Sequence, residues 1–256
     1  MSPPPIQIDA VVYTFLHQKM YLNIPSELPF ISRFSFIIKT KIINLLKGNT
    51  DYWVVQNKNV KLKLSEKFKI NQNKIWDLPF YPSMKGEGEF ERNDFGFIYV
   101  SHPFLHKNHL KLIDAFCLFY DKMKKGELTL TIDDSYTELN DYINTKIALG
   151  YPIKNIGFIK RDELYTYYQS NRYLIFPSLT ESFGLGIIEA LENGCDIIGS
   201  DLPYMHDVCT PSVVFDPNSI QSIADALNKS IVFQNIKRSE SKVKDEIETL
   251  IYRLNK

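Results

Sequence analysis

Short apolar segments alternate with amphipathic segments through the second half of the chain, and this alternation constrains the fold more than any other feature. Buried strands are predicted at 95–100, 128–132, 155–158, 173–176, 196–199 and 213–215. Helices are predicted at 110–123, 136–149, 162–169, 184–192 and 220–232. Such an alternation is typical of a parallel sheet with helices on both faces, in which ligands bind at the carboxyl ends of the strands.

The first part of the chain has fewer elements of the same kind. We expect strands at 6–15, 52–55 and 74–80, and helices at 31–46 and 60–68. The following stretch contains Pro82, Gly86 and Gly88 and is the best candidate for a linker. The sequence therefore predicts a partial N-terminal α/β domain at 1–84, a linker at 85–94, a larger α/β domain at 95–233 and a charged helical tail at 234–256.

Charge, cysteine spacing and the absence of long apolar runs bear on the class of protein and on its location. The 256 residues include 30 basic and 30 acidic side chains, so net charge gives no reason to expect a nucleic-acid partner. Three widely spaced cysteines fit a reduced interior, and neither a signal peptide nor a run of about 20 apolar residues is evident. A cytoplasmic location is expected. His102, His106 and His109 lack a nearby acidic ligand, and Pro103 interrupts their spacing, so no metal site is predicted.

The segment 177–194 joins a strand to a helix through a glycine-containing turn, with a glutamate on each side of the turn. Free backbone N–H groups at a helix N-terminus attract anions such as phosphate, and Gly184 and Gly186 would let a ligand approach the backbone closely. Glu181 and Glu189 add carboxylates that accept hydrogen bonds from hydroxyls. A ligand with both phosphates and many hydroxyls is a nucleotide sugar.

With these features in place, the chain resembles the retaining glycosyltransferases of the GT-B fold, in family 4 of these enzymes (glycosyl transferases group 1). The resemblance lies in the glutamate pair within 176–201, the lysine segment 107–116, the loop 155–164 and the segment 215–217. It runs in register from 95 to about 232 and is weaker over 11–79. It implies a GT-B fold with a complete C-terminal Rossmann-like sheet that binds the nucleotide sugar, and a truncated N-terminal domain on the acceptor side.

The resemblance also implies roles for individual residues. The expected catalytic residues are Lys107, Glu181 and His17, and the expected donor-binding residues are Lys107, Ile159, Lys160, Phe183, Gly184, Leu185 and Glu189. Lys107 would face the diphosphate, Glu181 the transferred sugar and Glu189 the ribose hydroxyls. The base would meet main-chain groups of the 155–164 loop, and backbone N–H groups at 183–185 would meet phosphate or sugar. The implied mechanism is front-face attack with retention and without a cofactor or bound metal.

Simpler interpretations stand beside these roles. A glutamate early in a helix is commonly a solvated residue favoured by the helix dipole, and Lys107 could be a surface lysine at a turn. His17 could equally be a loop histidine without a catalytic role. The basic stretch 33–47 fits a core helix with a basic outer face, or a helix on an anionic membrane surface at the inner face of the cell membrane.

Departures from the family pattern keep three functions open. Only about 80 residues precede the linker, and the first strand and glycine-rich loop of the family are missing. His102 stands where many members have arginine, Gly186 replaces a frequent proline, and Asp207 replaces a frequent glutamate. The leading hypothesis is a glycosyltransferase that acts on a glycan or lipid-linked acceptor in cell-surface polysaccharide biosynthesis. The second hypothesis is the donor-binding half of a split enzyme that needs a partner chain, and the third is a sugar-nucleotide epimerase of the same fold. The short N-terminal part would also fit an inactive relative.

Overall fold

The computed structural model describes residues 4–6, 8–24, 30–86, 88, 90–233 and 236–255, and the chain forms two compact units. The first unit comprises Met1–Tyr81, Glu181–Phe183 and Lys244–Lys256, and the second comprises Pro82–Thr180 and Gly184–Val243. The expected linker at 85–94 is part of the second unit, and the expected tail at 234–256 is shared between the two units. Residues 87 and 89 of that linker, and 234, 235 and 256 of that tail, lie outside the described residues.

The second unit is built on a six-stranded sheet in which every pairing is parallel. Its strands are β4 (Asn93–Tyr99), β5 (Glu127–Leu130), β6 (Ile153–Asn155), β7 (Asn171–Phe176), β8 (Asp196–Ser200) and β10 (Val213–Phe215). They lie in the order β10-β8-β7-β4-β5-β6, so the strand order reverses between β4 and β7. In open α/β sheets the ligand crevice opens at such a reversal, outside the carboxyl ends of the strands.

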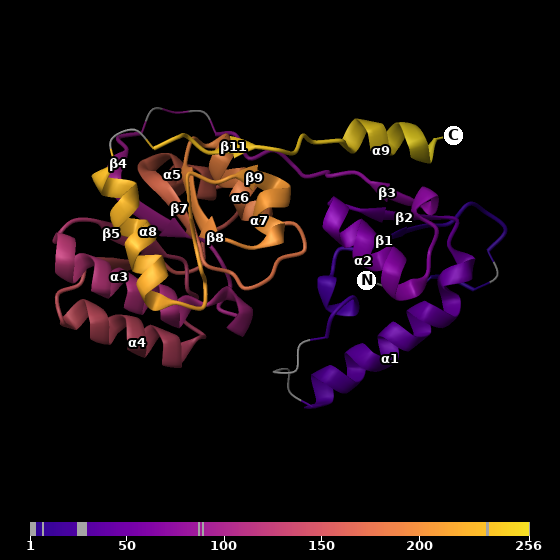
Figure 1. Ribbon diagram of the computed structural model, residues 1–256, viewed down its shortest axis with the longest axis horizontal. Helices are drawn as coiled ribbons and strands as arrows, with labels where there is room; N and C mark the ends of the chain where they lie inside the picture. The colour runs from indigo at the N-terminus through magenta and orange to yellow at the C-terminus, as the bar shows by residue number, and fades with distance from the viewer. Residues whose placement is uncertain are drawn as a thin grey trace. The chain divides into compact units, whose positions relative to one another are not determined.

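Helices cover both faces of this sheet, as Figure 1 shows. One face carries α3 (His109–Met123), α4 (Thr137–Ala148) and α8 (Ile220–Val232), and the other carries α5 (Leu164–Ser170), α6 (Leu185–Glu192) and α7 (Pro203–Val208). Strand residues such as Ile98, Leu174 and Ile198 are fully buried between these layers. The predicted α/β class with a doubly covered parallel sheet is therefore confirmed.

Some predicted boundaries in this unit are wrong. The strand expected at 155–158 ends at Asn155, because its side-chain amide hydrogen-bonds the backbone N–H and C=O of Ile132 instead of continuing the ladder. The helix expected at 162–169 begins at Leu164. The sequence also gave no indication of α7 or of the antiparallel pair β9 (Cys209–Thr210) and β11 (Glu240–Ser241).

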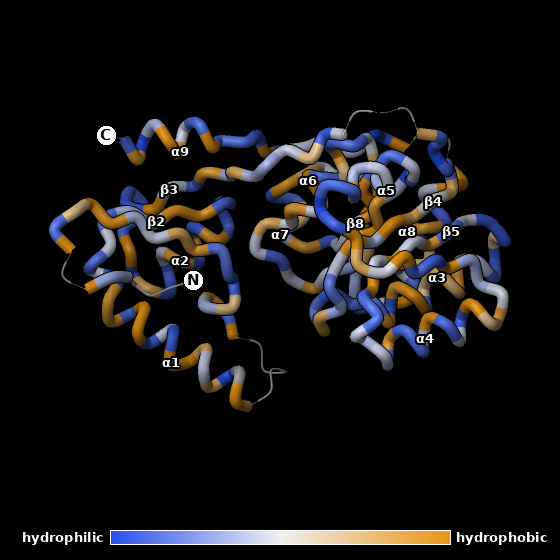
Figure 2. The backbone as a smooth tube through the Cα atoms, turned by 180° about the vertical axis from the view of Figure 1, so that it is seen from behind, coloured by the Kyte–Doolittle hydropathy of each residue, from blue (hydrophilic) through white to orange (hydrophobic). Residues whose placement is uncertain are grey.

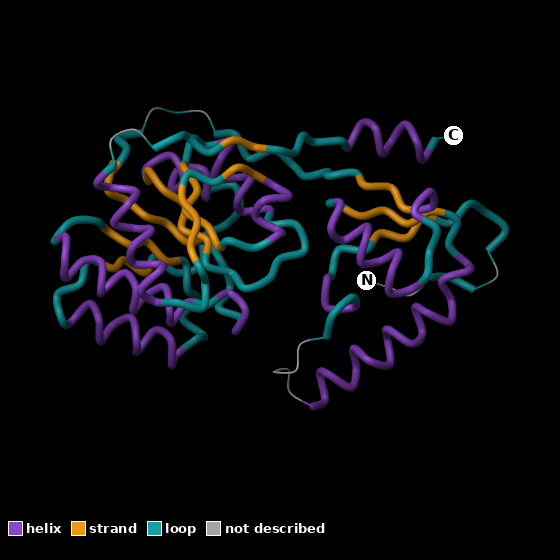
Figure 3. The backbone as a smooth tube through the Cα atoms, in the orientation of Figure 1, coloured by secondary structure: helices purple, strands orange, loops and turns teal. Residues whose placement is uncertain are grey.

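The first unit contains a smaller parallel sheet, whose strands and helices are drawn in Figure 3. Its strands are β1 (Tyr13–Phe15), β2 (Tyr52–Val55) and β3 (Ile75–Asp77), in the order β1-β2-β3. Its long helices are α1 (Phe30–Leu46) and α2 (Lys58–Phe68). The core forms around the fully buried Trp53, and includes Leu64 and Phe68 of α2.

The strand predicted at 6–15 is wrong over most of its length. Pairing with β2 begins at Tyr13, and the apolar side chains of Ile6, Ile8 and Val11 are more than half exposed. Residue 7 lies outside the described residues. An apolar run becomes a strand only where a neighbouring strand accepts its backbone hydrogen bonds, and β2 reaches only as far as Tyr13.

The C-terminal segment packs within the first unit. The N–H of Glu246 donates to the carbonyl of Pro79 at 2.7 Å, and the N–H of Tyr81 donates to the Asp245 carboxylate at 3.1 Å. In α9 (Ile247–Leu254), the guanidinium of Arg253 lies 5.0 Å from the ring centroid of Trp76. Of the tail that was predicted to be helical, only α9 is a helix among the described residues.

Helix α1 presents many apolar side chains to solvent. The exposed apolar residues are Phe30, Ile31, Phe34, Ile38, Ile42 and Leu45. The helix contains Arg33, Lys39 and Lys41 but no acidic residue, and Figure 2 shows apolar and hydrophilic stretches alternating along it. No helix among the described parts of the chain is both long and apolar enough to cross a bilayer.

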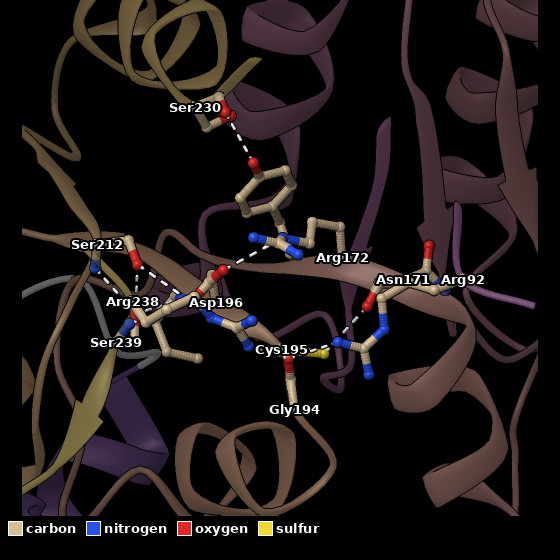
Figure 4. A network of polar contacts seen from close by, with 12 residues as sticks. Arg92, Asn171, Arg172, Gly194, Cys195, Asp196, Ser212, Ser230, Arg238 and Ser239 are labelled. Carbon is tan, nitrogen blue, oxygen red and sulfur yellow. Dashed lines mark hydrogen bonds and ion pairs between the residues drawn. The ribbon is translucent and has the colours of Figure 1, made fainter. Parts of the chain in front are cut away.

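A buried aspartate joins three segments at the amino-terminal edge of the large sheet (Figure 4). Asp196, the first residue of β8, accepts hydrogen bonds through Oδ1 from Arg238 Nε at 2.8 Å and from the backbone N–H of Ser239 at 3.1 Å. Its Oδ2 pairs with Arg172 Nε at 3.2 Å. These contacts fix the segment that follows α8 against β7 and β8.

Candidate functional site

Two loops meet at the carboxyl edge of the large sheet, where the strand order reverses. The loop after β4 ends in a 3₁₀ turn, η4 (Leu105–Lys107), and the loop after β7 begins at Pro177. The ammonium group of Lys107 lies 5.8 Å from the ring centroid of Phe176, the last residue of β7. Lys107 is therefore placed at the switch point of the sheet, where a ligand crevice is expected.

A buried tyrosine fixes the position of this lysine. The Tyr99 hydroxyl, at the end of β4, donates to the backbone carbonyl of Lys107 at 2.9 Å and lies 3.1 Å from the Ser178 hydroxyl. Ser178 is fully buried, and its carbonyl accepts a hydrogen bond from the Tyr204 hydroxyl at 2.6 Å. The two switch-point loops are thus held together by side chains from β4 and α7.

An asparagine adds the loop after β10 to this arrangement. Asn108 has a left-handed backbone conformation, with φ of 63°, which Asn tolerates better than most residues. Its Nδ2 donates to the carbonyl of Pro177 at 3.2 Å and to that of Pro217 at 2.7 Å. The backbone N–H of Leu179 also donates to the carbonyl of His106 at 2.8 Å. Three loops at one edge of the sheet therefore form a rigid frame.

Helix α6 begins at this edge with uncapped backbone donors. Its N-cap residue, Gly184, has φ of 87°, and no side chain caps the helix. No hydrogen bond is recorded for the N–H of Phe183, Gly184 or Leu185 within the described part of the chain. Uncapped N–H groups at a helix N-terminus carry partial positive charge and bind anions.

Glu189 lies one turn further along α6 and is almost completely buried. Its side chain is 7% exposed, and Oε1 accepts hydrogen bonds from Nε of Arg161 at 3.1 Å and from Nη2 at 2.9 Å. Burial raises the pKa of Glu189 above its ordinary value, and the Arg161 guanidinium opposes that rise. The structure therefore contradicts a solvated role for Glu189, because the carboxylate is buried and paired.

The loop after β6 reaches Glu189 through that same arginine. Ile159 and Lys160 precede Arg161, so the ion pair brings their loop against α6. Among the described residues, no hydrogen bond is recorded for the backbone N–H of Ile159 or Lys160. Two main-chain donors thus remain available in a loop that adjoins the buried carboxylate.

Three of the residues predicted to act in catalysis or donor binding belong to the first unit: His17, Glu181 and Phe183. Within that unit, the hydroxyl of Ser182 accepts a hydrogen bond from the backbone N–H of Lys19 at 3.0 Å. His17 is exposed, and its ring centroid lies 5.7 Å from that of Phe15. Lys107 and Glu189 therefore share one unit, whereas Glu181 and His17 share the other.

The three histidines at 102, 106 and 109 lie in the loop after β4 and at the first position of α3. In the part of the chain that the structure describes, no group of three or more His, Cys, Asp or Glu side chains is arranged to hold a metal ion. His109 is buried, with its ring centroid 4.7 Å from that of Tyr99, and burial lowers its pKa to about 3. It is a neutral residue of the core beneath the loop.

Sequence reasoning missed the side chains that support the site, above all Arg161, Tyr99 and Asn108. Tyr99 lies in the strand predicted at 95–100 and Asn108 in the lysine segment 107–116, but their hydrogen bonds reach loops that are far away in the sequence. Arg161 lies 28 positions from Glu189. The one available signal was that Arg161 directly follows two residues expected to contact the donor.

Comparisons with known proteins agree on one family. The family model described as glycosyl transferases group 1 matches residues 82–241. The serotype-specific mannosyltransferase WbdA of Escherichia coli is 32% identical over 76 residues, which are 29% of this chain and 9% of that protein. Alpha-monoglucosyldiacylglycerol synthase of Acholeplasma laidlawii is 29% identical over 154 residues, which are 56% of this chain and 38% of that protein.

Solved structures give the fold. The Anabaena protein HepE, in complex with UDP and glucose, matches with a TM-score of 0.66 at 15% identity, over 87% of this chain and 62% of that chain. The predicted GT-B type of α/β fold is thereby confirmed. This chain spans less than two thirds of the length of each of these three proteins.

Proposed function

Since the chain belongs to the family of glycosyl transferases group 1, we propose that it transfers a sugar from a nucleotide-sugar donor to a glycan or lipid-linked acceptor. We place this reaction in the biosynthesis of a cell-surface polysaccharide and expect retention of the donor's anomeric configuration. The relatives whose names describe mannosyl and glucosyl transfer support this class of reaction.

The observation that carries the proposal is the position of Lys107. Its ammonium group lies over Phe176 at the switch point of the sheet, on a loop that Tyr99 and Asn108 hold rigid. A fixed cation at this place stabilises the negative charge that grows on a leaving diphosphate. Because the loop is already ordered, little reorganisation is needed when the donor binds.

The remaining donor contacts follow from the chemistry of each group. The uncapped N–H groups at Phe183, Gly184 and Leu185 suit phosphate or sugar oxygens, and Glu189 suits the ribose hydroxyls. The main-chain groups of Ile159 and Lys160 suit the base. Each charge-assisted hydrogen bond of this kind contributes about 1.5–3 kcal/mol.

We assign the chemical step to front-face attack by the acceptor hydroxyl on the anomeric carbon. The acceptor oxygen forms the new glycosidic bond as the bond to the diphosphate breaks, and the leaving phosphate takes the acceptor's proton. Glu181 holds hydroxyls of the transferred sugar, and His17 acts on the acceptor side. We expect this reaction to need no cofactor and no metal, so activity should survive EDTA treatment.

The first test is a panel of UDP-, GDP-, ADP- and dTDP-sugars in a thermal-shift assay. A donor at 100 times its dissociation constant adds about 2.7 kcal/mol of stability, which gives a clear rise in Tm. Lys107→Ala should reduce the rise strongly, and the matched control Lys124→Ala, a largely exposed lysine at the far end of α3, should keep it. If no donor raises the Tm of the unaltered chain, the proposed function is wrong.

A second candidate includes a partner chain. Under this alternative, the chain is the donor-binding half of a split enzyme and acts only with a partner chain. Transfer is measured with the purified chain alone and with the product of an adjacent gene. Activity only in the mixture favours the split enzyme, and donor binding without turnover in either sample favours an inactive relative.

We also propose that α1 contacts an anionic membrane surface, since it combines exposed apolar side chains with cations and no acidic residue. Sedimentation with vesicles of phosphatidylglycerol and phosphatidylcholine tests this. Phe34→Ser should reduce binding to anionic vesicles, whereas the control Leu118→Ser, on the exposed side of α3, should not. Equal binding by the two variants contradicts membrane contact through α1.

A further inference from the structure

We propose that Arg161 is a positioning residue for the nucleotide site, which holds Glu189 ionised and turned so that its second oxygen receives the ribose hydroxyls. This inference rests on the proposed function, because it concerns how a nucleotide is held. Arg161 was not among the residues expected to bind the donor, and its two contacts suggest the role.

The first contact fixes the carboxylate. Both Nε and Nη2 of Arg161 donate to the same oxygen of Glu189, Oε1, at 3.1 and 2.9 Å. A carboxylate offers about four lone-pair sites, two on each oxygen. The arginine occupies the two on Oε1, and no hydrogen bond to Oε2 is recorded among the described residues. Two acceptor sites therefore remain, which is the number that a pair of neighbouring ribose hydroxyls requires.

The second contact fixes the arginine. Its Nη2 also donates to the backbone carbonyl of Pro82 at 2.8 Å, so the guanidinium is held from two directions. The planar guanidinium has rigidly placed donors, and it transmits the position of one partner to the other. The orientation of Glu189 thus depends on the residues that follow Pro82.

Those residues are themselves bound firmly to α6. The Glu192 carboxylate accepts a hydrogen bond from the N–H of Met84 at 2.9 Å, and Nδ2 of Asn193 donates to the carbonyl of Met84 at 3.0 Å. A Cβ atom at Gly86 would lie only 1.8 Å from the Tyr165 ring, so this stretch packs closely. Arg161 therefore has a rigid support, which a positioning residue needs.

The charges around Glu189 explain why a cation is required there. The Glu189 carboxylate is nearly buried, and a second carboxylate, that of Glu192, lies on the same helix. On the neighbouring helix α5, the buried hydroxyl of Tyr168 has no hydrogen-bond partner among the described residues. Burial and Glu192 both raise the pKa of Glu189, and among the charged groups of the described residues Arg161 is the one that lowers it. Without the arginine, Glu189 would take up a proton at a higher pH, and a protonated carboxyl loses acceptor capacity toward the ribose.

The test measures dissociation constants by calorimetry for UDP and GDP, for their 2′,3′-dideoxy analogues and for inorganic pyrophosphate. The ratio of the dideoxy constant to the ribo constant isolates the ribose contacts, and titration of the phosphates cancels in that ratio. We expect a ratio of about tenfold or more in the unaltered chain. In Arg161→Gln this ratio should approach one as pH falls from 7.5 to 5.5, while the affinity for pyrophosphate should equal that of the unaltered chain at each pH.

Two further variants separate charge from geometry and from general loss of stability. Arg161→Lys keeps the charge but cannot bridge both partners in the same way, so it should restore the pH profile and leave the ratio reduced. Arg172→Gln removes an arginine that pairs with Asp196 at the opposite edge of the sheet, and it should keep both the ratio and the pH profile. In a Glu189→Gln background, Arg161→Gln should cause no additional change in the ratio.

The outcomes distinguish this inference from the function on which it rests. If Arg161→Gln keeps the ratio and pH profile of the unaltered chain, the inference is wrong and the proposed function stands. An equal loss of affinity for pyrophosphate and UDP in Arg161→Gln also contradicts it, because that pattern indicates general damage to the site. If the unaltered chain binds none of the nucleotides, both proposals are wrong.

Discussion

Asp196→Asn is expected to destabilise the second unit strongly, because one buried carboxylate neutralises two arginines there. The Asp196 side chain is 5% exposed, and its two oxygens contact Arg238, Ser239 and Arg172. An Asn side chain keeps one acceptor oxygen but turns an NH₂ group toward a guanidinium, so a donor faces a donor. The arginines are left without their counter-charge.

The size of the effect follows from the burial of the partners. Removing one member of a fully buried ion pair costs about 3–5 kcal/mol. The side chains of Arg172 and Arg238 are 31% and 56% exposed, so water compensates part of the loss. We expect a loss of about 3 kcal/mol in the free energy of unfolding, which corresponds to a fall of about 6–12 °C in Tm for a chain of this size.

The assay is urea unfolding followed by far-UV circular dichroism, with hydrogen exchange at β8 and at 238–241. Circular dichroism is the appropriate signal because both tryptophans of the chain, Trp53 and Trp76, lie in the first unit, so their fluorescence reports mainly on that unit. The matched control is Glu240→Gln, which breaks an exposed pair with Lys237 and should change stability by at most about 1 kcal/mol. A shift in Asp196→Asn no larger than in this control refutes the reasoning.

Three further predictions concern the frame around the lysine loop. Asn108→Gly keeps the left-handed backbone but removes two hydrogen bonds, so unfolding free energy from urea titrations should fall by about 2 kcal/mol; an unchanged value contradicts the frame. Gly184→Ala should lower the Tm more than the control Gly150→Ala does. Both glycines have positive φ, but a Cβ at 184 would lie 2.9 Å from Ile187 Cδ1, whereas a Cβ at 150 would meet no atom within 4 Å; equal losses in Tm contradict this. Burial lowers the pKa of His109 to about 3 in the folded state, whereas the unfolded chain takes up this proton near pH 6.5. Acidification below pH 6.5 should therefore reduce the free energy of unfolding by up to about 1.4 kcal/mol per pH unit. His109→Gln should lose less stability than the unaltered chain between pH 7 and 4.5, and parallel pH curves for the two proteins refute the reasoning.

The alternation of apolar and amphipathic segments was enough to predict the α/β class, because a strand buried on both faces must be almost wholly apolar. The predicted ends of strands were wrong where a single tertiary contact determines the end. The strand expected to continue to 158 ends when the Asn155 amide bonds Ile132, and residues before Tyr13 find no strand alongside them. Such contacts join residues that no local pattern connects.

The candidate site was likewise only partly predictable from the sequence. Lys107 and the glycine turn at Gly184 could be located from the sequence because each follows a predicted strand, and parallel strands end at one edge of a sheet. The Arg161–Glu189 pair could not be located, because it depends on the packing of a loop against a helix 28 positions away. The catalytic and binding roles themselves remain predictions that the proposed experiments test.

The return of the C-terminal segment to the first unit determines how the chain can be divided. A gene fragment that stops at residue 81 would encode a first unit without Asp245, Glu246 and α9. It would lack the Asp245 acceptor for the N–H of Tyr81, the Glu246 N–H that donates to Pro79, and the Arg253 cation beside Trp76. A clone that begins at residue 82 would carry α9 as an amphipathic peptide with no surface to cover. Expression of the first unit by itself therefore calls for a gene in which 244–256 is joined to 1–81, and expression of the second unit calls for a clone that ends at residue 243.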